Sequence, residues 1–537
     1  MDDSRLVFGI DLGTTYSCVS QVDKFDQAIV LKNFEGKNTT PSVVYFGDDN
    51  NVIVGDEAKE LSKLEPGKTV SYVKRSISTD ETYNKPTKFP NGLDPTEISA
   101  FILKKIVKDA NDAGQFPEPI KDVVITCPAY FGTKERLRTK QAGEIAGLNV
   151  MAIINEPTAA AIAYGMKVQE EKIILVYDLG GGTFDVTIIR VNGGTITVIA
   201  TGGDHHLGGV DWDIALAEYL LSQYNKENGT SYTMESDSGL KNTLLLLAEE
   251  QKKRLSARDT VNAVLTYKGT SSTIKISRSI FDQLTEFRLN ETIEKAKEVL
   301  GIAKGKGFTK VNEVLLVGGS SRMPQIKERV DRELGCDAKL TDPDECVAKG
   351  AAIFAMNEAF AIAMEEYAEG TRDERPQSIG MSNRTRVLNV TSKTYGIEFT
   401  DDRDNNKQKV SNMIFANSLL DGNCKAAETF ATLFDNQTGV VLQIYESDVT
   451  DSIRDKIITP NMAVPMEEGE PHELKLTKYW PKDTPIEVVF EIDTEGILHV
   501  HGELDKDSVD FEMKIKGVKD NNELANSVAL LAKSNVQ

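Results

Sequence analysis

Two glycine-rich turns in this chain carry the same residue types in the same order. The first lies in 7–16 (VFGIDLGTTY) and the second in 175–183 (LVYDLGGGT). Each begins with an apolar run, continues with an aspartate, glycines and threonine, and leads into another apolar run, at 17–22 and at 185–191. Glycines let backbone N–H groups approach an anion, and threonine hydroxyls add further donors. The pattern predicts two β-hairpins whose turns bind phosphate groups.

The aspartates of the two turns, Asp11 and Asp178, would repel phosphate unless a cation lay between them. Mg²⁺ held largely through water explains their position best. One such turn alone is more simply a tight hairpin turn, but the matched pair favours a phosphate site. The chain has neither G-x-x-x-x-G-K-[ST] nor a G-x-G-x-x-G that opens a helix, so Walker-type and Rossmann dinucleotide sites are not supported.

The duplication extends beyond the turns. Residues 123–128 (VVITCP) are answered by 314–319 (VLLVGG), each a strand running toward a helix. The small-residue stretch 155–161 (NEPTAAA) is answered by 344–352 (DECVAKGAA). Three matched elements in matched order predict two related α/β lobes.

Composition narrows the class of protein. A chain of 537 residues is long enough for two to four domains, and a net charge of −21 argues against nucleic acid or an anionic membrane as the main partner. The five cysteines are scattered and form no C-x-x-C pair, which favours a reducing compartment over a disulfide framework or a zinc site. The start of the chain lacks a secretory pattern, and no uninterrupted apolar stretch is long enough to span a membrane, so we expect a cytoplasmic protein.

A polar stretch that contains both proline and glycine lies at 375–383 (RPQSIGMSN). After it, the apolar residues alternate as they do in β-strands. Strands are predicted at 390–399, at 440–445 and in the hairpin 486–501, which together indicate a β-sandwich. We therefore divide the chain into a nucleotide domain (1–375), a linker (376–389), a β-domain (390–518) and a tail (519–537) with one short helix.

Four segments resemble the signatures of the DnaK-type, seventy-kilodalton heat-shock chaperones: 9–17, 155–161, 178–185 and 317–324. The resemblance runs from about residue 5 to about residue 518. It implies a duplicated, actin-like (ribonuclease-H-like) ATPase domain of two α/β lobes, followed by a β-sandwich that binds polypeptide. It also implies a chaperone of protein folding and the stress response.

The resemblance assigns roles to individual residues around ATP or ADP and Mg²⁺. Lys74 would offset the charge that develops in phosphoryl transfer, and the metal would lie near Asp11 and Asp178. The implied catalytic residues are Lys74, Glu156, Asp178 and Thr183. The implied nucleotide-binding residues are Gly13, Thr14, Thr15, Tyr16, Gly180, Gly181, Gly182, Glu249, Lys252, Lys253, Ser256, Gly318, Gly319, Ser320, Arg322 and Asp344.

Simpler interpretations remain open for some of these residues. Without the resemblance, Lys74 would be predicted to be a solvated surface lysine. The spacing of 249–256 by itself predicts only an ordinary amphipathic helix face. The resemblance places a peptide groove in the β-domain, although alternation alone would make each groove residue an inward-facing core residue just as readily. These residues are Ile397, Phe399, Phe430, Leu433, Val440 and Leu442.

Three features depart from the family pattern. Only 20 residues follow Gly517, where the family has a helical lid. The linker segment 385–389 (TRVLN) is polar where relatives dock apolar residues, which puts coupling between the domains in doubt. Ala152 stands where the family often has an arginine that meets J-domain partners.

The sequence thus favours an ATPase chaperone that binds unfolded or nascent polypeptide and hydrolyses ATP. Further candidate partners are a J-domain co-chaperone, a nucleotide-exchange factor and the ribosome. The alternative is a non-cycling, ATP-binding co-chaperone scaffold similar to lid-less, ribosome-associated relatives. A sugar-kinase-like enzyme fits poorly, because the β-rich second domain offers no acceptor site.

Overall fold

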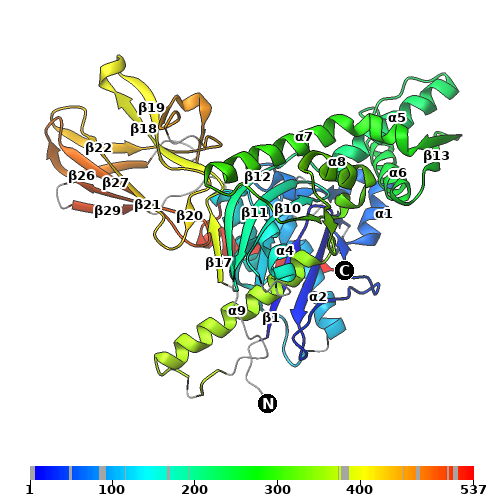
Figure 1. The fold of residues 1–537 in the computed structure, drawn as a ribbon, viewed down its shortest axis with the longest axis horizontal. Coiled ribbons are helices and arrows are strands. Elements are labelled where there is room, and N and C mark those ends of the chain that lie inside the picture. The colour runs from blue at the N-terminus through cyan, green and yellow to red at the C-terminus, as the bar shows by residue number, and fades with distance from the viewer. Residues whose placement is uncertain are drawn as a thin grey trace.

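Two mixed α/β lobes and a separate β-rich domain make up the chain (Figure 1). The computed structural model describes residues 6–47, 51–83, 92–114, 116–165, 170–192, 194–372, 374–376, 386–450, 453–466, 472–504, 507–511 and 518–537. Most of the expected linker, at 377–385, lies outside the described residues.

The first lobe is built on a sheet with the strand order β3 (Ala28–Leu31), β2 (Tyr16–Val22), β1 (Val7–Leu12), β8 (Asp122–Cys127) and β9 (Asn149–Asn155). The short strand β4 (Thr40–Pro41) also pairs with β2. β1 and β2 are antiparallel, whereas β8 runs parallel to β1 and β9 parallel to β8. Its helices include α2 (Pro95–Gly114), α3 (Thr133–Ile145) and α4 (Glu156–Gly165).

The second lobe repeats this plan. Its sheet has the order β16 (Lys339–Leu340), β15 (Glu313–Val317), β10 (Lys172–Leu179), β11 (Phe184–Asn192) and β12 (Thr195–Asp204). β10 and β11 form an antiparallel hairpin, and β15 lies parallel to β10. Both glycine turns are therefore hairpin turns, as the sequence predicts. The helices of this lobe are α5 (Gly209–Asn228), α6 (Ser238–Ala257), α7 (Arg278–Gly305) and α8 (Pro324–Leu334).

Large apolar side chains hold the second lobe together. Tyr177 and Phe184 flank the glycine turn, are fully buried, and pack at a ring separation of 4.7 Å. Trp212, also fully buried, joins them from α5. Burying residues of this size stabilises the fold by about 1.5–3 kcal/mol each. The base of the turn is therefore fixed on both sides, which positions the backbone that would meet a phosphate group.

Helix α9 (Cys346–Ala368) crosses between the lobes and packs on α4, β1 and β2. Gly9 and Gly350 allow this packing: a Cβ on either would lie within 2.1 Å of the facing backbone. Among the described residues, α9 is also the one helix that is long and apolar enough to cross a membrane, although half of its most apolar stretch is buried in the fold. We attribute its composition to this core position.

Two smaller units flank the cleft between the lobes. On the first lobe lies a sheet with the order β30 (Asn535–Val536), β6 (Asn51–Val54), β5 (Val43–Phe46) and β7 (Thr69–Ser71), beside α1 (Asp56–Leu64). On the second lobe, β13 (Thr260–Tyr267) and β14 (Thr270–Ser277) form a hairpin against α6 and α5. The 3-10 helix η2 (Val73–Ser76) carries Lys74 from the first unit into the cleft.

The β-domain has two main sheets and a further strand pair. The first is β24 (Ile457–Ile458), β19 (Lys407–Ile414), β18 (Thr394–Asp401), β23 (Ile444–Ser447) and β25 (Val464–Pro465). The second is β21 (Lys425–Ala431), β27 (Pro485–Ile492), β28 (Leu498–Leu504) and β29 (Asp507–Phe511). β22 (Gln437–Leu442) pairs with β26 (His472–Trp480). Alternate residues of β27 and β28 are buried, as expected for a sheet with one solvated face.

The described part of the linker pairs with both domains despite its polar side chains, while coupling between the domains stays a prediction. β17 (Arg386–Val390) lies parallel to β12 of the second lobe and antiparallel to β20 (Leu419–Leu420) of the β-domain. A strand ladder uses backbone groups, so polar side chains in this segment do not prevent pairing. The tail contains α10 (Asn521–Ala532), the short helix that the sequence predicts.

Candidate nucleotide site

A cleft of about 530 Å³ lies between the two lobes and takes its lining from both. All the residues predicted to bind nucleotide line it except Gly182, and so do Asp11, Lys74, Glu156, Asp178 and Thr183. The cleft therefore joins segments more than 300 residues apart in sequence, such as Thr14 and Asp344.

The two glycine turns meet at the centre of the cleft. A Cβ built on Gly181 would lie 2.2 Å from Oγ1 of Thr15, and one on Gly182 would lie 2.2 Å from Cγ2 of Thr14. Larger residues would force the turns apart. The turns thus present their backbone donors and threonine hydroxyls to one shared volume, as a chain of phosphate groups requires.

Lys74 is only 6% exposed and forms an ion pair with Glu156. Burial alone would lower the pKa of this lysine, but Glu156 and Asp11 outweigh it and the pKa is raised. Lys74 is therefore a fixed positive charge inside the cleft. The interpretation of this residue as a solvated surface lysine is wrong.

Asp11 and Asp178 face the same charged centre. Burial and the neighbouring Glu156 raise the pKa of Asp11 to about 7, although Thr126 donates a hydrogen bond to it at 3.1 Å. The same two causes, burial first, raise the pKa of Asp178. Asp185 is a fourth buried carboxylate beside them, so Asp11, Glu156, Asp178 and Asp185 share Lys74 as their nearby cation among the described residues. An excess of buried carboxylate oxygens fits a divalent cation such as Mg²⁺.

One face of α6 forms another wall of the cleft, as the resemblance implies. Glu249 accepts hydrogen bonds from Tyr16, Lys59 and Lys253 at 2.6–3.1 Å. Burial alone would raise the pKa of Glu249, but the two lysines outweigh it and lower that pKa to about 2. Lys59 lies on α1, so this cluster ties the first lobe to the second across the cleft.

Lys252 lies deeper in the same wall, where its ammonium donates to Asp213 and to the carbonyl of Gly209, each at 2.8 Å. Gly318 and the exposed pair Arg322 and Asp344 also line the cleft. Gly318 has φ +78°, and a Cβ there would meet the carbonyl oxygen of Leu179 at 2.4 Å. This glycine lets the second half of the cleft approach the aspartate turn.

Sequence reasoning missed several residues of the site. Arg75 donates to the carbonyl of Gly182 at 2.7 Å and forms an ion pair with Asp211, so it supports the second turn from the first lobe. Its position next to Lys74 was the available signal. Arg75 itself does not line the cleft. No local signal marks the lining residues that the sequence did not predict, which are Lys37, Thr39, Asp56, Val210, Asp213, Met323, Pro343 and Val347.

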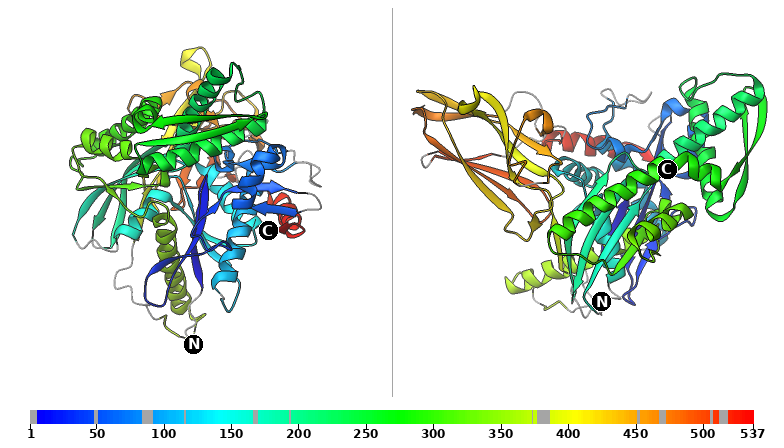
Figure 2. Two further views of the ribbon diagram at one scale, coloured as in Figure 1. Left: turned by 90° about the vertical axis from the view of Figure 1, so that its right-hand side faces the viewer. Right: turned by 45° about the horizontal axis from the view of Figure 1, so that its top comes forward.

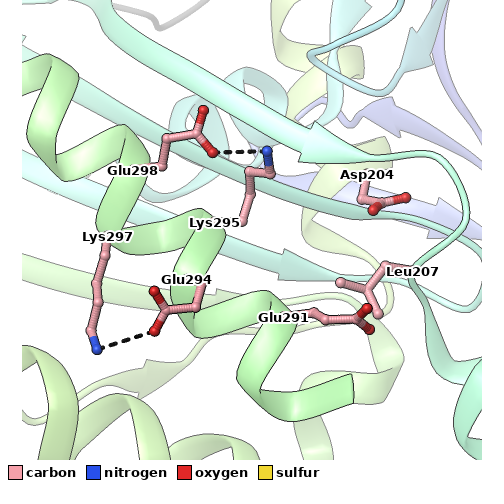
Figure 3. Close-up of a pocket in the computed structure, with 7 residues that line it drawn as sticks. All are labelled: Asp204, Leu207, Glu291, Glu294, Lys295, Lys297 and Glu298. Carbon is pink, nitrogen blue, oxygen red and sulfur yellow. Dashed lines mark hydrogen bonds and ion pairs between the residues drawn. The ribbon is translucent and has the colours of Figure 1, made fainter. Parts of the chain in front are cut away.

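A second cavity, of about 650 Å³, lies beside α7 near the end of β12 (Figure 3). Its charged groups largely pair with one another, as in Lys295–Glu298 and Lys297–Glu294. Asp204 and Glu291 add further negative charge to its lining. This surface would repel phosphate, and neither glycine turn contributes to it, so the cleft is the better nucleotide site.

The six predicted groove residues differ in their burial within the β-domain. Ile397 and Leu442 are buried in its core, and Phe430 and Val440 pack against that core. Leu433 is 37% exposed, and the ring centroids of Phe399 and Phe430 lie 6.0 Å apart. Ile397 and Leu442 thus lie in the core and Leu433 is partly exposed, while the peptide groove stays a prediction.

Comparison with known proteins identifies the family of this chain. A family model described as "Hsp70 protein" matches residues 7–534. The "Chaperone protein DnaK" of Thermosipho melanesiensis is 36% identical over 504 residues, which cover 92% of this chain and 77% of that protein. The protein of the same name from Thermosipho africanus shows the same identity and coverage. With a duplicated fold, two facing glycine turns and this match over nearly its whole length, the chain belongs to the Hsp70 family of chaperones.

Proposed function

We propose that this chain is an ATP-dependent chaperone that hydrolyses Mg-ATP in the cleft and binds unfolded or nascent polypeptide in the β-domain. The observation that carries the proposal is the buried pair of Lys74 and Glu156, which lines the same cleft as Asp11, Asp178 and the two facing glycine turns. Buried charge of this kind, enclosed in a cleft, is costly to fold and is typical of catalytic sites.

Hydrolysis in this cleft would depend on positioning and charge. The turns at 13–16 and 180–183 supply donors for the phosphate chain, and Lys74 offsets the charge that grows on the transferred group. Glu156 holds Lys74 in place and, with Asp178 and Thr183, can orient the attacking water. Asp11 and Asp178 would hold Mg²⁺, largely through water, and the ion would neutralise phosphate charge.

An actin-like ATPase domain and a β-sandwich that binds peptide are the finer form of this proposal. The linker strand β17, paired with both domains, is a physical route by which the cleft could affect the β-domain. Arg136 of α3 adds a second route, because its guanidinium bonds to Asn155, next to Glu156, and to the carbonyl of Glu495 in the β-domain. J-domain and exchange-factor partners fit the same proposal.

The test is the variant Lys74→Ala in single-turnover hydrolysis of ATP. We expect ATP affinity to change little and the hydrolysis rate to fall by about two orders of magnitude or more, because the lysine stabilises charge that develops only in the transition state.

Lys105→Ala is the matched control, since Lys105 is also a buried lysine and pairs with Asp109 outside the cleft. It should lower stability without lowering the rate. Equal single-turnover rates in Lys74→Ala and the parent protein would remove Lys74 from catalysis and leave ATP binding without turnover as the function of the cleft.

A further inference from the structure

The second glycine turn, at 180–183, has a hydrogen-bond partner on each of three consecutive carbonyl groups. The carbonyls of Gly180 and Gly181 accept backbone hydrogen bonds from the first turn of α5, in the same lobe, at 3.0 and 2.8 Å. The carbonyl of Gly182 accepts instead from Nε of Arg75 at 2.7 Å, and Arg75 lies on η2 of the first lobe. One carbonyl of the turn therefore depends on a residue from the opposite lobe.

The bond from Arg75 fixes the direction of the peptide group between Gly182 and Thr183. A trans peptide is planar, with its carbonyl oxygen and its N–H on opposite sides. Because the oxygen faces Arg75, the N–H of Thr183 points away from Arg75, and Thr183 lines the cleft whereas Arg75 does not. A Cβ built on Gly208 would lie 2.4 Å from the carbonyl carbon of Gly182, so the start of α5 also packs against this peptide. Arg75 thus directs a backbone donor in the part of the turn that borders the cleft.

Asp211 holds the guanidinium of Arg75 in this position. One carboxylate oxygen of Asp211 lies 2.6 Å from Nη2 of Arg75 and also accepts from the backbone N–H of Gly208 at 2.8 Å. Both side chains are mostly buried, which strengthens these bonds relative to bonds in water. The fork of an arginine can donate to a carboxylate and to a carbonyl at once, whereas a lysine carries one compact charge. The arginine therefore joins α5 and the glycine turn of the second lobe to the first lobe.

The 3-10 helix η2 carries Lys74 and Arg75 as neighbours and directs them to opposite lobes. Lys74 pairs with Glu156 in the first lobe, while Arg75 reaches the second. Arg138 of α3 fixes the residues after η2 by donating to two carbonyls within 77–79. The unit that carries η2, drawn in blue, lies beside the green helices of the second lobe, where α1 contacts α6 (Figure 2). The position of Lys74 relative to the second turn is therefore set by the contact that Arg75 makes.

We propose that Arg75 is a positioning residue for ATP hydrolysis, which holds the Gly182–Thr183 peptide in the direction that the reaction requires. The proposal rests on the proposed function of the cleft. Arg75 does not line the cleft, so it acts through the turn and not by contact with nucleotide. Because Arg75 comes from the first lobe, the turn has its full set of partners only while the two lobes are in contact. Hydrolysis is thereby favoured in the closed cleft.

The test compares Arg75→Ala with the parent protein in the single-turnover rate at saturating Mg-ATP and in the dissociation constant for Mg-ATP. We expect the rate to fall about tenfold or more and the dissociation constant to change by less than about threefold. A bound phosphate chain keeps its other donors and can shift to meet a displaced one, whereas the transition state needs each donor in place. Arg75→Lys should recover part of the rate, because lysine keeps the charge and loses the fork.

Arg278→Ala is the matched control. Arg278 also joins a carbonyl and an aspartate, those of Leu255 and Asp259, each at 2.9 Å, and it does not line the cleft. Its loss should lower the free energy of unfolding and leave the single-turnover rate unchanged. Asp211→Asn gives a second check, because asparagine can still accept from the start of α5 but no longer holds Arg75 by charge. Added to Arg75→Ala, it should slow hydrolysis no further, since Asp211 acts through Arg75.

Equal single-turnover rates in Arg75→Ala and the parent would overturn the proposal and leave the proposed ATPase function intact. If Arg75→Ala does not fold, Arg75→Lys replaces it, and a rate less than about threefold below the parent has the same meaning. A parent that binds Mg-ATP without hydrolysing it refutes the proposed function instead. Arg75 is then judged by hydrogen exchange of residues 179–185, which Mg-ATP should slow at least about threefold more in the parent than in Arg75→Ala. Equal protection in the two proteins would overturn the positioning role.

Discussion

The contact between the two glycine turns gives a direct test of the nucleotide site through the variant Gly182→Ala. The new Cβ would lie 2.2 Å from Cγ2 and 2.6 Å from Cβ of Thr14. A threonine Cβ is fixed by its backbone, so rotation of the side chain cannot relieve the overlap and the two turns must move apart. Thr14 is 6% exposed, which leaves little room for that movement.

The size of the effect follows from the cost of overpacking, about 1–3 kcal/mol for an extra carbon in a close-packed site. If ATP needs both turns in their present positions, the same free energy is lost from binding. The dissociation constant for Mg-ATP should then rise by about 5- to 150-fold. The assay is calorimetric titration, supported by the increase in melting temperature that saturating Mg-ATP produces.

Gly301→Ala is the matched control. Gly301 lies within α7, and a Cβ there meets no atom within 4 Å. This substitution should leave ATP affinity unchanged and raise the free energy of unfolding by about 0.5–1 kcal/mol, because alanine loses less entropy than glycine in a helix. If Gly182→Ala binds Mg-ATP within about twofold of the parent, the turns do not need to meet when ATP binds, and our account of the cleft is wrong.

Two further predictions concern the contact between the domains. Burial and Lys393 lower the pKa of His205 to about 3, with His206 and Asp448 as the other charges beside it. In the unfolded chain this histidine titrates near pH 6.5, so the free energy of unfolding decreases as the pH is lowered from 6.5. The decrease is about 2 kcal/mol at pH 5. His205→Gln should remove this part of the decrease in denaturant melts. Burial and Glu135 raise the pKa of Glu446 to about 7. Glu446→Gln should therefore raise the melting temperature above pH 7 and have no effect below pH 4.5; a gain that is independent of pH would contradict this charge assignment.

Local sequence was sufficient for the parts of the site that depend on backbone conformation. The hairpin form of both turns follows from their glycines and the apolar runs beside them, and the structure confirms it. The common face of 249–256 follows from the period of a helix, and all four predicted residues of that face reach the cleft. The short helix of the tail follows from the spacing of its leucines and valine.

Local sequence was not sufficient where a residue's role depends on a distant partner. Lys59 and Glu249 are 190 positions apart, and neither has a neighbour in sequence that signals their contact. The burial of Lys74 likewise depends on the position of η2 in the cleft, which the neighbouring sequence does not predict. The polar side chains of the linker misled us, because its backbone pairs with β12 and its two valines, Val387 and Val390, pack in the core of the lobes.

The sequence by itself determined the two glycine turns, the duplicated lobes, the β-rich second domain and the family. Each of these can be predicted from short-range patterns of residue type. The tertiary structure alone decided that Lys74 is a buried cation, that the linker forms a strand between the domains, and that β30 completes a sheet edge of the first lobe. Burial and strand pairing are properties of surfaces that meet only after folding. The free energy that stabilises them comes from residues hundreds of positions away in the chain.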